Sequence, residues 1–113
     1  MAAQDFFGNF RFPHEAEAVM MSDEVAHETI ASWGFDVDDL RQVNSWMQTV
    51  WQEAARRGRI HMCRWLKAAN TLDMLNVTGY QGDLTPLEIA MHEGKEELAS
   101  WLVVNGADTT AVN

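Results

Sequence analysis

Apolar residues in the last third of the chain recur at helical spacing in two short stretches, each followed by a glycine. The two sets are Leu87, Ile89 and Ala90 before Gly94, and Leu98, Trp101 and Leu102 before Gly106. Residues three or four apart share one face of a helix, and glycine commonly follows a helix end. The pattern therefore predicts two short helices joined by a turn at Gly94.

The residues before the first of these helices are typical of a helix start. The Thr85 hydroxyl can accept a hydrogen bond from the backbone N–H of Glu88, and the Glu88 side chain can reach back to Thr85. Pro86 follows at the first helical position, where its missing N–H removes no hydrogen bond. We expect a helix that begins directly after Thr85.

The same pattern occurs 36 residues earlier in the chain. Thr49 and Gln52 repeat the pair of capping residues. At the same shift, residues of the same or similar type correspond one to one. Ala54, Gly58, Met62, Trp65 and Leu66 correspond to Ala90, Gly94, Leu98, Trp101 and Leu102. Two helical hairpins with equivalent apolar faces can stack and cover each other.

The later unit resembles an ankyrin repeat. The resemblance is carried by Thr85-Pro86-Leu87, Ala90, Gly94, Leu98, Leu102 and Gly106-Ala107-Asp108. Residues 49–81 are similar to a degenerate repeat, so the resemblance covers roughly residues 49–113. Glu88 replaces the family's usual histidine, and the shift of 36 exceeds the usual ~33. The extra residues fall in the connection between the units.

The resemblance implies an all-α fold, a short ankyrin-type helical solenoid with capping helices at its N-terminal end. The expected divisions are a Phe-rich segment at 1–12, a helical cap or decayed repeat at 13–48, a degenerate repeat at 49–81, and a C-terminal repeat at 82–113. Lys95, Glu96, Glu97 and Ser100 predict a polar outer face on the last helix, as a terminal repeat requires.

Residues 13–48 predict helices without the repeat pattern, and no stretch favours a strand. One helix is expected from Pro13 through Met21, and a second, capped by Ser22, up to Trp33. A third, capped by Asp36 or Asp38, would carry Leu40, Val43 and Met47 on one face. Trp33 and Trp46 are expected in the core of this cap.

Charge and cysteine content exclude several kinds of protein. The net charge of −9 argues against a nucleic-acid partner, because phosphate binding needs a basic surface. No apolar run is long enough for a membrane span. The single cysteine, Cys63, forms no internal disulfide and favours a reducing, intracellular compartment, the cytoplasm or nucleus before an organelle.

The sequence contains no pattern typical of catalysis or of a cofactor. The four histidines are scattered, His61 and Cys63 lack zinc-ligand spacing, and no Gly-rich phosphate loop or nucleophile elbow is present. We therefore expect no enzyme activity, no metal site and no cofactor. We expect His61 to lie on the surface and the neighbouring Cys63 thiol to be half-buried.

A cluster of basic residues interrupts the acidic chain. Residues 49–81 hold five bases against two acids, namely Arg56, Arg57, Arg59, Arg64 and Lys67. One interpretation is a solvated face neutralised by the neighbouring acidic units; the other is an anchor for an acidic segment of a protein partner. The ankyrin resemblance implies a partner surface over the hairpin tips and first helices, which here includes Arg56, Arg57, Leu84, His92 and Glu93.

The N-terminal segment is rich in phenylalanine. Phe6, Phe7, Phe10 and Phe12 lie within seven residues. Either these rings pack back onto the chain's own helices, or they dock into a partner, and the sequence does not decide between the two.

Together these features predict a non-catalytic protein-interaction module, an ankyrin-type adaptor or regulatory protein with a protein partner. The alternative is a permanent accessory or structural subunit of a larger complex, anchored by the Phe-rich segment. Fold alone does not name the partner.

Overall fold

The computed structural model describes residues 20–80 and 82–110, and these form an all-α structure without strands, as predicted. The helices are α1 (Asp23–Ser32), α2 (Val50–Arg57), α3 (Ile60–Ala68), the 3-10 helix η1 (Leu72–Met74), α4 (Pro86–His92) and α5 (Glu96–Val104). The Phe-rich segment and most of the helix expected from Pro13 to Met21 lie outside the described residues. The last two residues of that range, Met20 and Met21, are not helical.

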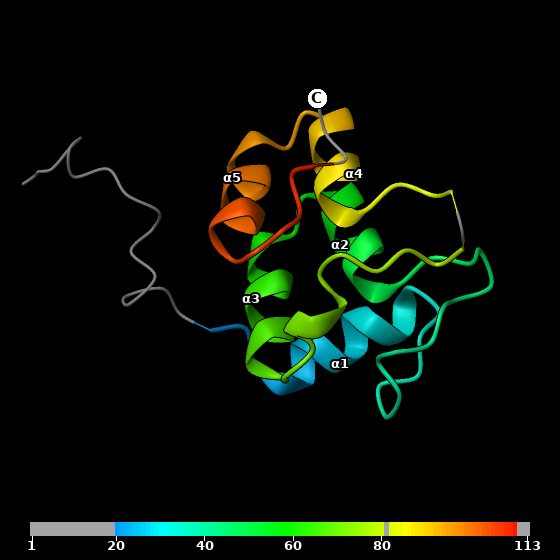
Figure 1. Ribbon diagram of the computed structural model, residues 1–113. Helices are drawn as coiled ribbons and strands as arrows, with labels where there is room; N and C mark the ends of the chain where they lie inside the picture. The colour runs from blue at the N-terminus through cyan, green and yellow to red at the C-terminus, as the bar shows by residue number, and fades with distance from the viewer. Residues whose placement is uncertain (1–19, 81, 111–113) are drawn as a thin grey trace, which may run out of the picture.

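The helices form three successive layers (Figure 1). α1 lies at one end, α2 and α3 form a first helical hairpin in the middle, and α4 and α5 form a second helical hairpin at the other end. The buried apolar side chains of all three layers belong to one hydrophobic core. Each layer covers an apolar face of the next, which is how short helices gain most of their stability.

Both predicted capping pairs are confirmed. The Thr49 hydroxyl accepts from the Gln52 N–H at 3.1 Å, and Gln52 Oε1 accepts from the Thr49 N–H at 2.7 Å. In the second pair, the Thr85 hydroxyl accepts from the Glu88 N–H at 3.2 Å, and Glu88 Oε1 accepts from the Thr85 N–H at 2.8 Å. Ser22 caps α1, also as predicted. Local chemistry therefore fixes where α1, α2 and α4 begin.

Tryptophans join the layers. Trp51 of α2 and Trp101 of α5 stack with their ring centroids 6.3 Å apart, and both are almost fully buried. The indole N–H of Trp65 on α3 donates to the Asp23 carboxylate at 2.9 Å, which ties α1 to the first hairpin. All three tryptophans therefore lie in the core.

The third helix expected in the N-terminal cap is wrong, because residues 33–49 form turns and irregular structure. Asn44 explains the difference. Its side-chain oxygen accepts from the N–H groups of Trp46 and Gln48 at 3.0 and 3.1 Å, and its own N–H donates to the Gln48 carbonyl at 3.0 Å. These bonds close a compact loop in place of a helical turn.

The connection between the two hairpins is anchored on α2 through the buried side chain of Gln52. Its oxygen accepts from the Gly79 N–H at 3.1 Å, and its amide donates to Asp83 at 3.0 Å and to the Leu84 carbonyl at 2.8 Å. Gly79 lies against the backbone of Met47 so closely that a Cβ would be 1.7 Å from the Met47 carbonyl oxygen. The inserted residues are thus held by specific contacts.

The outer face of α5 is only partly polar. Glu96, Glu97 and Ser100 are exposed, as predicted. Val103 and Val104, however, are 45% and 75% exposed on the same helix. The prediction of a polar final face is therefore wrong for the C-terminal half of α5.

Candidate functional site

A hollow of about 380 Å³ opens between the loop before α2 and the last turns of α2. Its lining residues are Trp46, Gln48, Glu53, Arg56 and Arg57. They come from two adjacent pieces of chain, because the loop closed by Asn44 returns directly to the start of α2. The hollow combines an aromatic side chain with two guanidinium groups.

Glu53 is the buried charge around which the hollow is built, with only 6% of its surface exposed. Its carboxylate accepts from the Asn44 amide at 3.1 Å and forms ion pairs with Arg56 and Arg57. A buried carboxylate is tolerated only with such partners. Two guanidinium groups against one carboxylate leave one excess positive charge here.

The two arginines are held in place by further contacts. Arg56 donates to Gln48 Oε1 at 3.1 Å. The Arg57 guanidinium lies over the Trp33 ring, 4.7 Å from its centroid, and links α2 to the end of α1. Both side chains remain partly exposed, at 40% and 38%. They are therefore positioned before any ligand arrives.

Sequence reasoning missed Gln48 and Glu53 of this hollow and, above all, Trp46. It was expected in the core of the cap, but it is 69% exposed. The following residue, Met47, has a φ of 61°, in the left-handed region. The available signal was Asn44, since asparagine favours turns that end a helix and so removes Trp46 from a helical face.

The other predicted partner-binding residues do not line this hollow. His92 ends α4, Glu93 follows it, and both are exposed. They occupy the positions in the second hairpin that Arg56 and Arg57 occupy in the first. Leu84 precedes the α4 cap and is 37% exposed. The role of these residues remains a prediction, as does that of Phe6, Phe7, Phe10 and Phe12 outside the described residues.

The remaining basic residues do not form one face with the arginines of the hollow. Arg59 is exposed, Arg64 is 7% exposed, and Lys67 donates to the Asn105 side chain at 2.8 Å. The neutralisation expected from neighbouring acidic units occurs for Arg56 and Arg57 within α2 itself, through Glu53. Of the five basic residues of the cluster, only Arg56 and Arg57 therefore line the hollow.

Other chemistry is sparse in the part of the chain that the structure describes. Cys63 is fully buried rather than half-buried, and burial raises the pKa of its thiol strongly. His61 is exposed, as expected. Within residues 20–80 and 82–110, no three His, Cys, Asp or Glu side chains gather as they would to hold a metal ion. No helix there is long and apolar enough to cross a membrane.

Comparison with known proteins identifies one part of the chain. The family model of the ankyrin repeat matches residues 82–113, which include α4 and α5. This match confirms the resemblance that the sequence carries from Thr85 to Asp108. No curated protein and no solved structure matches the chain.

Proposed function

We propose that this chain is a non-catalytic adaptor or regulatory protein, and that the hollow beside α2 binds an acidic segment of a partner protein. The ankyrin repeat at residues 82–113 is typical of a protein-interaction module, and beside it the first hairpin presents Arg56 and Arg57 next to Trp46 of the preceding loop. The observation that carries the proposal is an exposed tryptophan next to two pre-positioned arginines.

The charge of the hollow supports an acidic ligand. Glu53 neutralises one of the two arginines, so a carboxylate from a partner restores balance at the site. Arginine favours such contacts because its planar guanidinium can bind a carboxylate with two parallel hydrogen bonds. The partner need not order these side chains, which lowers the entropic cost of binding.

Trp46 supports a peptide ligand rather than a small ion. Large aromatic side chains supply much of the energy of protein interfaces. The exposed indole can cover an apolar side chain of the partner peptide. Carboxylates of the same peptide can then reach the two arginines. Leu84, His92 and Glu93 are further partner contacts that the ankyrin resemblance implies; they lie before α4 and at its end, outside the hollow.

Selection of random displayed peptides on the immobilised full chain tests the proposal. We expect the selected peptides to be rich in Asp and Glu with at least one large apolar residue. Their affinity should fall as salt rises, because exposed charge pairs are screened. Trp46→Ala should weaken binding at least about tenfold, as for an aromatic interface anchor.

Arg59→Ala is the matched control, because Arg59 is exposed and does not line the hollow. It removes one positive charge and should leave the peptide affinity within about twofold. Selected peptides without acidic residues, or equal losses in the Trp46 and Arg59 variants, would refute the proposal.

A second candidate function is that of a permanent accessory subunit held by Phe6, Phe7, Phe10 and Phe12. Four phenylalanines within seven residues favour it. Sedimentation and thermal unfolding of the full chain and of a chain starting at Pro13 distinguish the two. Loss of self-association on removal of the rings, with unchanged stability, would support this second function.

A further inference from the structure

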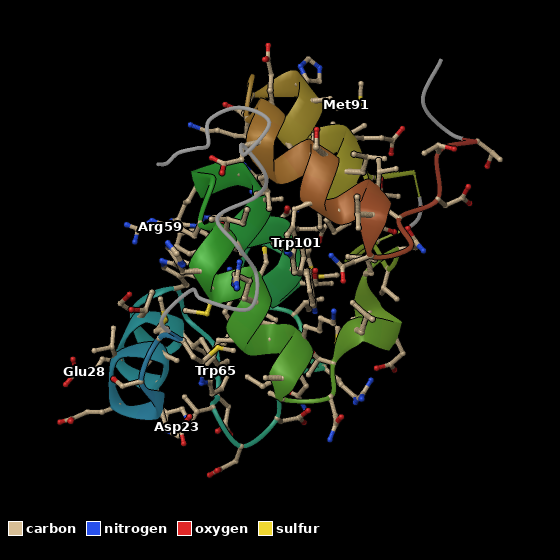
Figure 2. The ribbon with its side chains drawn as sticks, turned by 90° about the vertical axis from the view of Figure 1, so that its left-hand side faces the viewer. Asp23, Glu28, Arg59, Trp65, Met91 and Trp101 are labelled. Carbon is tan, nitrogen blue, oxygen red and sulfur yellow. The ribbon has the colours of Figure 1, made fainter. Side chains whose placement is uncertain are left out.

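A second, larger groove lies on the outer face of the α4–α5 hairpin, at the end of the molecule opposite α1. It has a volume of about 630 Å³ and is lined mainly by apolar groups. The lining residues are Leu87, Met91, Gly94, Glu96, Ala99, Ser100, Val103 and Val104. Figure 2 shows Met91 on this end of the molecule, whereas Trp101 lies between the two hairpins.

The first hairpin has an equivalent face, on α2 and α3, and that face is covered by another helical hairpin. The residue 36 positions before Met91 is Ala55, which is fully buried, while Met91 is 51% exposed. Cys63 corresponds in the same way to Ala99; Cys63 is fully buried, and Ala99 is partly exposed. The face of α2 and α3 is covered by a helical hairpin, with Trp101 stacked on Trp51. Within residues 20–80 and 82–110, no helical hairpin covers the equivalent face of α4 and α5.

The contact at Gly58 shows which residue type the covering hairpin places at this turn. Gly58 ends α2 with a φ of 67°, and the aliphatic stem of Lys95 lies 2.9 Å from the position that a Cβ would take there. Gly94 is its equivalent in the second hairpin, with a φ of 72°, and no atom of the residues that the structure describes lies within 4 Å of its Cβ position. A lysine stem fills this position on the first hairpin.

The charges around the groove favour a basic occupant. Glu96 lines it, Glu93 adjoins Gly94, and none of the lining residues is basic. Lys95, the sole base of residues 82–113, lies against Gly58 of the first hairpin instead. Acidic groups at one end of an apolar groove complement an amphipathic helix with Lys or Arg beside its apolar face.

We propose that this outer groove binds a basic amphipathic helix of a partner protein. The helix lays apolar side chains on Met91, Val103 and Val104, and a lysine or arginine crosses Gly94 near Glu93 and Glu96. This surface is separate from the hollow beside α2, so the two could be occupied at once. A second copy of the chain fits poorly, because pairing two such faces brings together chains of net charge −9 and their glutamates.

A synthetic Lys/Leu peptide of about 18 residues, arranged as an amphipathic helix, is the probe for the full-length chain. The key variant is Val103→Lys with Val104→Ala, which installs the residue types of Lys67 and Ala68 in the first hairpin. Val77→Lys is the control, because Val77 is 42% exposed, does not line the groove, and the change adds the same charge.

We expect saturable binding of one peptide per chain, weakened at least about tenfold by the Val103/Val104 variant, as for loss of interface anchors. Val77→Lys and Trp46→Ala should change the affinity for the peptide less than about twofold. Thermal unfolding checks that each variant is folded. In the unsubstituted chain, methyl NMR signals of Met91, Val103 and Val104 should shift on titration.

Several results would overturn the inference. A scrambled peptide of the same composition that binds equally well would mean that charge alone drives binding. Methyl signals of the groove that stay unchanged on titration would place the peptide elsewhere. A dimer that the Val103/Val104 variant dissociates would make a second copy the occupant. Nuclear Overhauser contacts from these valines to Phe6 or Phe10 would make it the chain's own N-terminal segment.

Discussion

Gln52 shows at the scale of a single residue why two similar capping pairs have different chemistry. Its fully buried side chain accepts two hydrogen bonds and donates two, to Asp83 and to the Leu84 carbonyl. Glu88, at the same position of the second hairpin, is partly exposed and accepts from Thr85. Only an amide satisfies the first environment, whereas a carboxylate suits the second.

We therefore predict that Gln52→Glu lowers the free energy of unfolding by about 3 kcal/mol, because it removes two donors and buries a carboxylate beside Asp83. The deficit should shrink as pH falls and the new carboxylate is protonated. Denaturant titration at pH 7 and pH 4.5 measures both effects.

Glu88→Gln is the matched control for this position. A glutamine can still accept from the Thr85 N–H, so the change in unfolding free energy should stay within about 0.5 kcal/mol. Equal effects of the two substitutions would contradict the assigned role of Gln52.

Cys63 supports a second prediction at this scale. Burial raises the pKa of the thiol, so the folded chain holds it protonated at pH 8 and a thiol reagent should react only after unfolding. The folded pKa lies above the unfolded one. The stability that the buried thiol contributes is therefore complete below about pH 8.5 and is lost as pH rises above that value. Rapid labelling at pH 8 without denaturant would show that the core opens around α3.

At the scale of elements, the sequence predicted the five α-helices that the structure describes, and three of them begin at a side-chain cap. Thr49 and Thr85 begin α2 and α4, and Ser22 begins α1. The third helix of the cap, expected after Asp36 or Asp38, does not form, although the sequence offers both a capping residue and apolar spacing for it. The bonds from the Asn44 side chain and the packing of Gly79 on Met47 are contacts whose partners a spacing pattern does not reveal.

The same limit applies to the candidate site. Arg56 and Arg57 were identified from charge and from the ankyrin resemblance. The hollow itself depends on Trp46, which the loop exposes, and on Glu53, which the loop helps to bury. Asn44 indicated a turn before Trp46, but the course of that loop, and with it the burial of Glu53, could not be predicted.

The connection between the two hairpins packs on the loop before α2 through Gly79 and Met47. This contact gives a prediction at the element scale. Gly79→Ala should lower the free energy of unfolding by about 3 kcal/mol, because the new methyl group would collide with the backbone of Met47. Gly82→Ala meets no atom within 4 Å and carries only the strain of its φ of 88°, about 1 kcal/mol. Chemical denaturation compares them, and equal losses would refute the close packing.

At the scale of the whole molecule, the two hairpins share one core but present surfaces of opposite charge. The hollow beside α2 carries excess positive charge, and the outer groove of α4 and α5 carries acidic groups at its rim. The stacked pair of Trp51 and Trp101 joins the hairpins. The two proposed binding surfaces therefore lie on a framework that is already packed.

This shared core predicts a single unfolding transition. Replacing Trp101 by leucine should lower the free energy of unfolding by about 2–3 kcal/mol and still leave one transition, because both hairpins lose the same contact. Tryptophan fluorescence and circular dichroism, followed on the same samples, should give coincident curves. Separate transitions would contradict the shared core.

The most direct test of the proposed interaction surface is an NMR titration of the ¹⁵N-labelled full chain with a selected acidic peptide, followed through the indole N–H signals of its tryptophans. We predict that the Trp46 signal shifts saturably, while those of Trp51 and Trp65, whose N–H groups are bound to Thr71 and Asp23, stay in place. An unchanged Trp46 signal, with binding established by another method, would contradict the assignment of the hollow as the binding site.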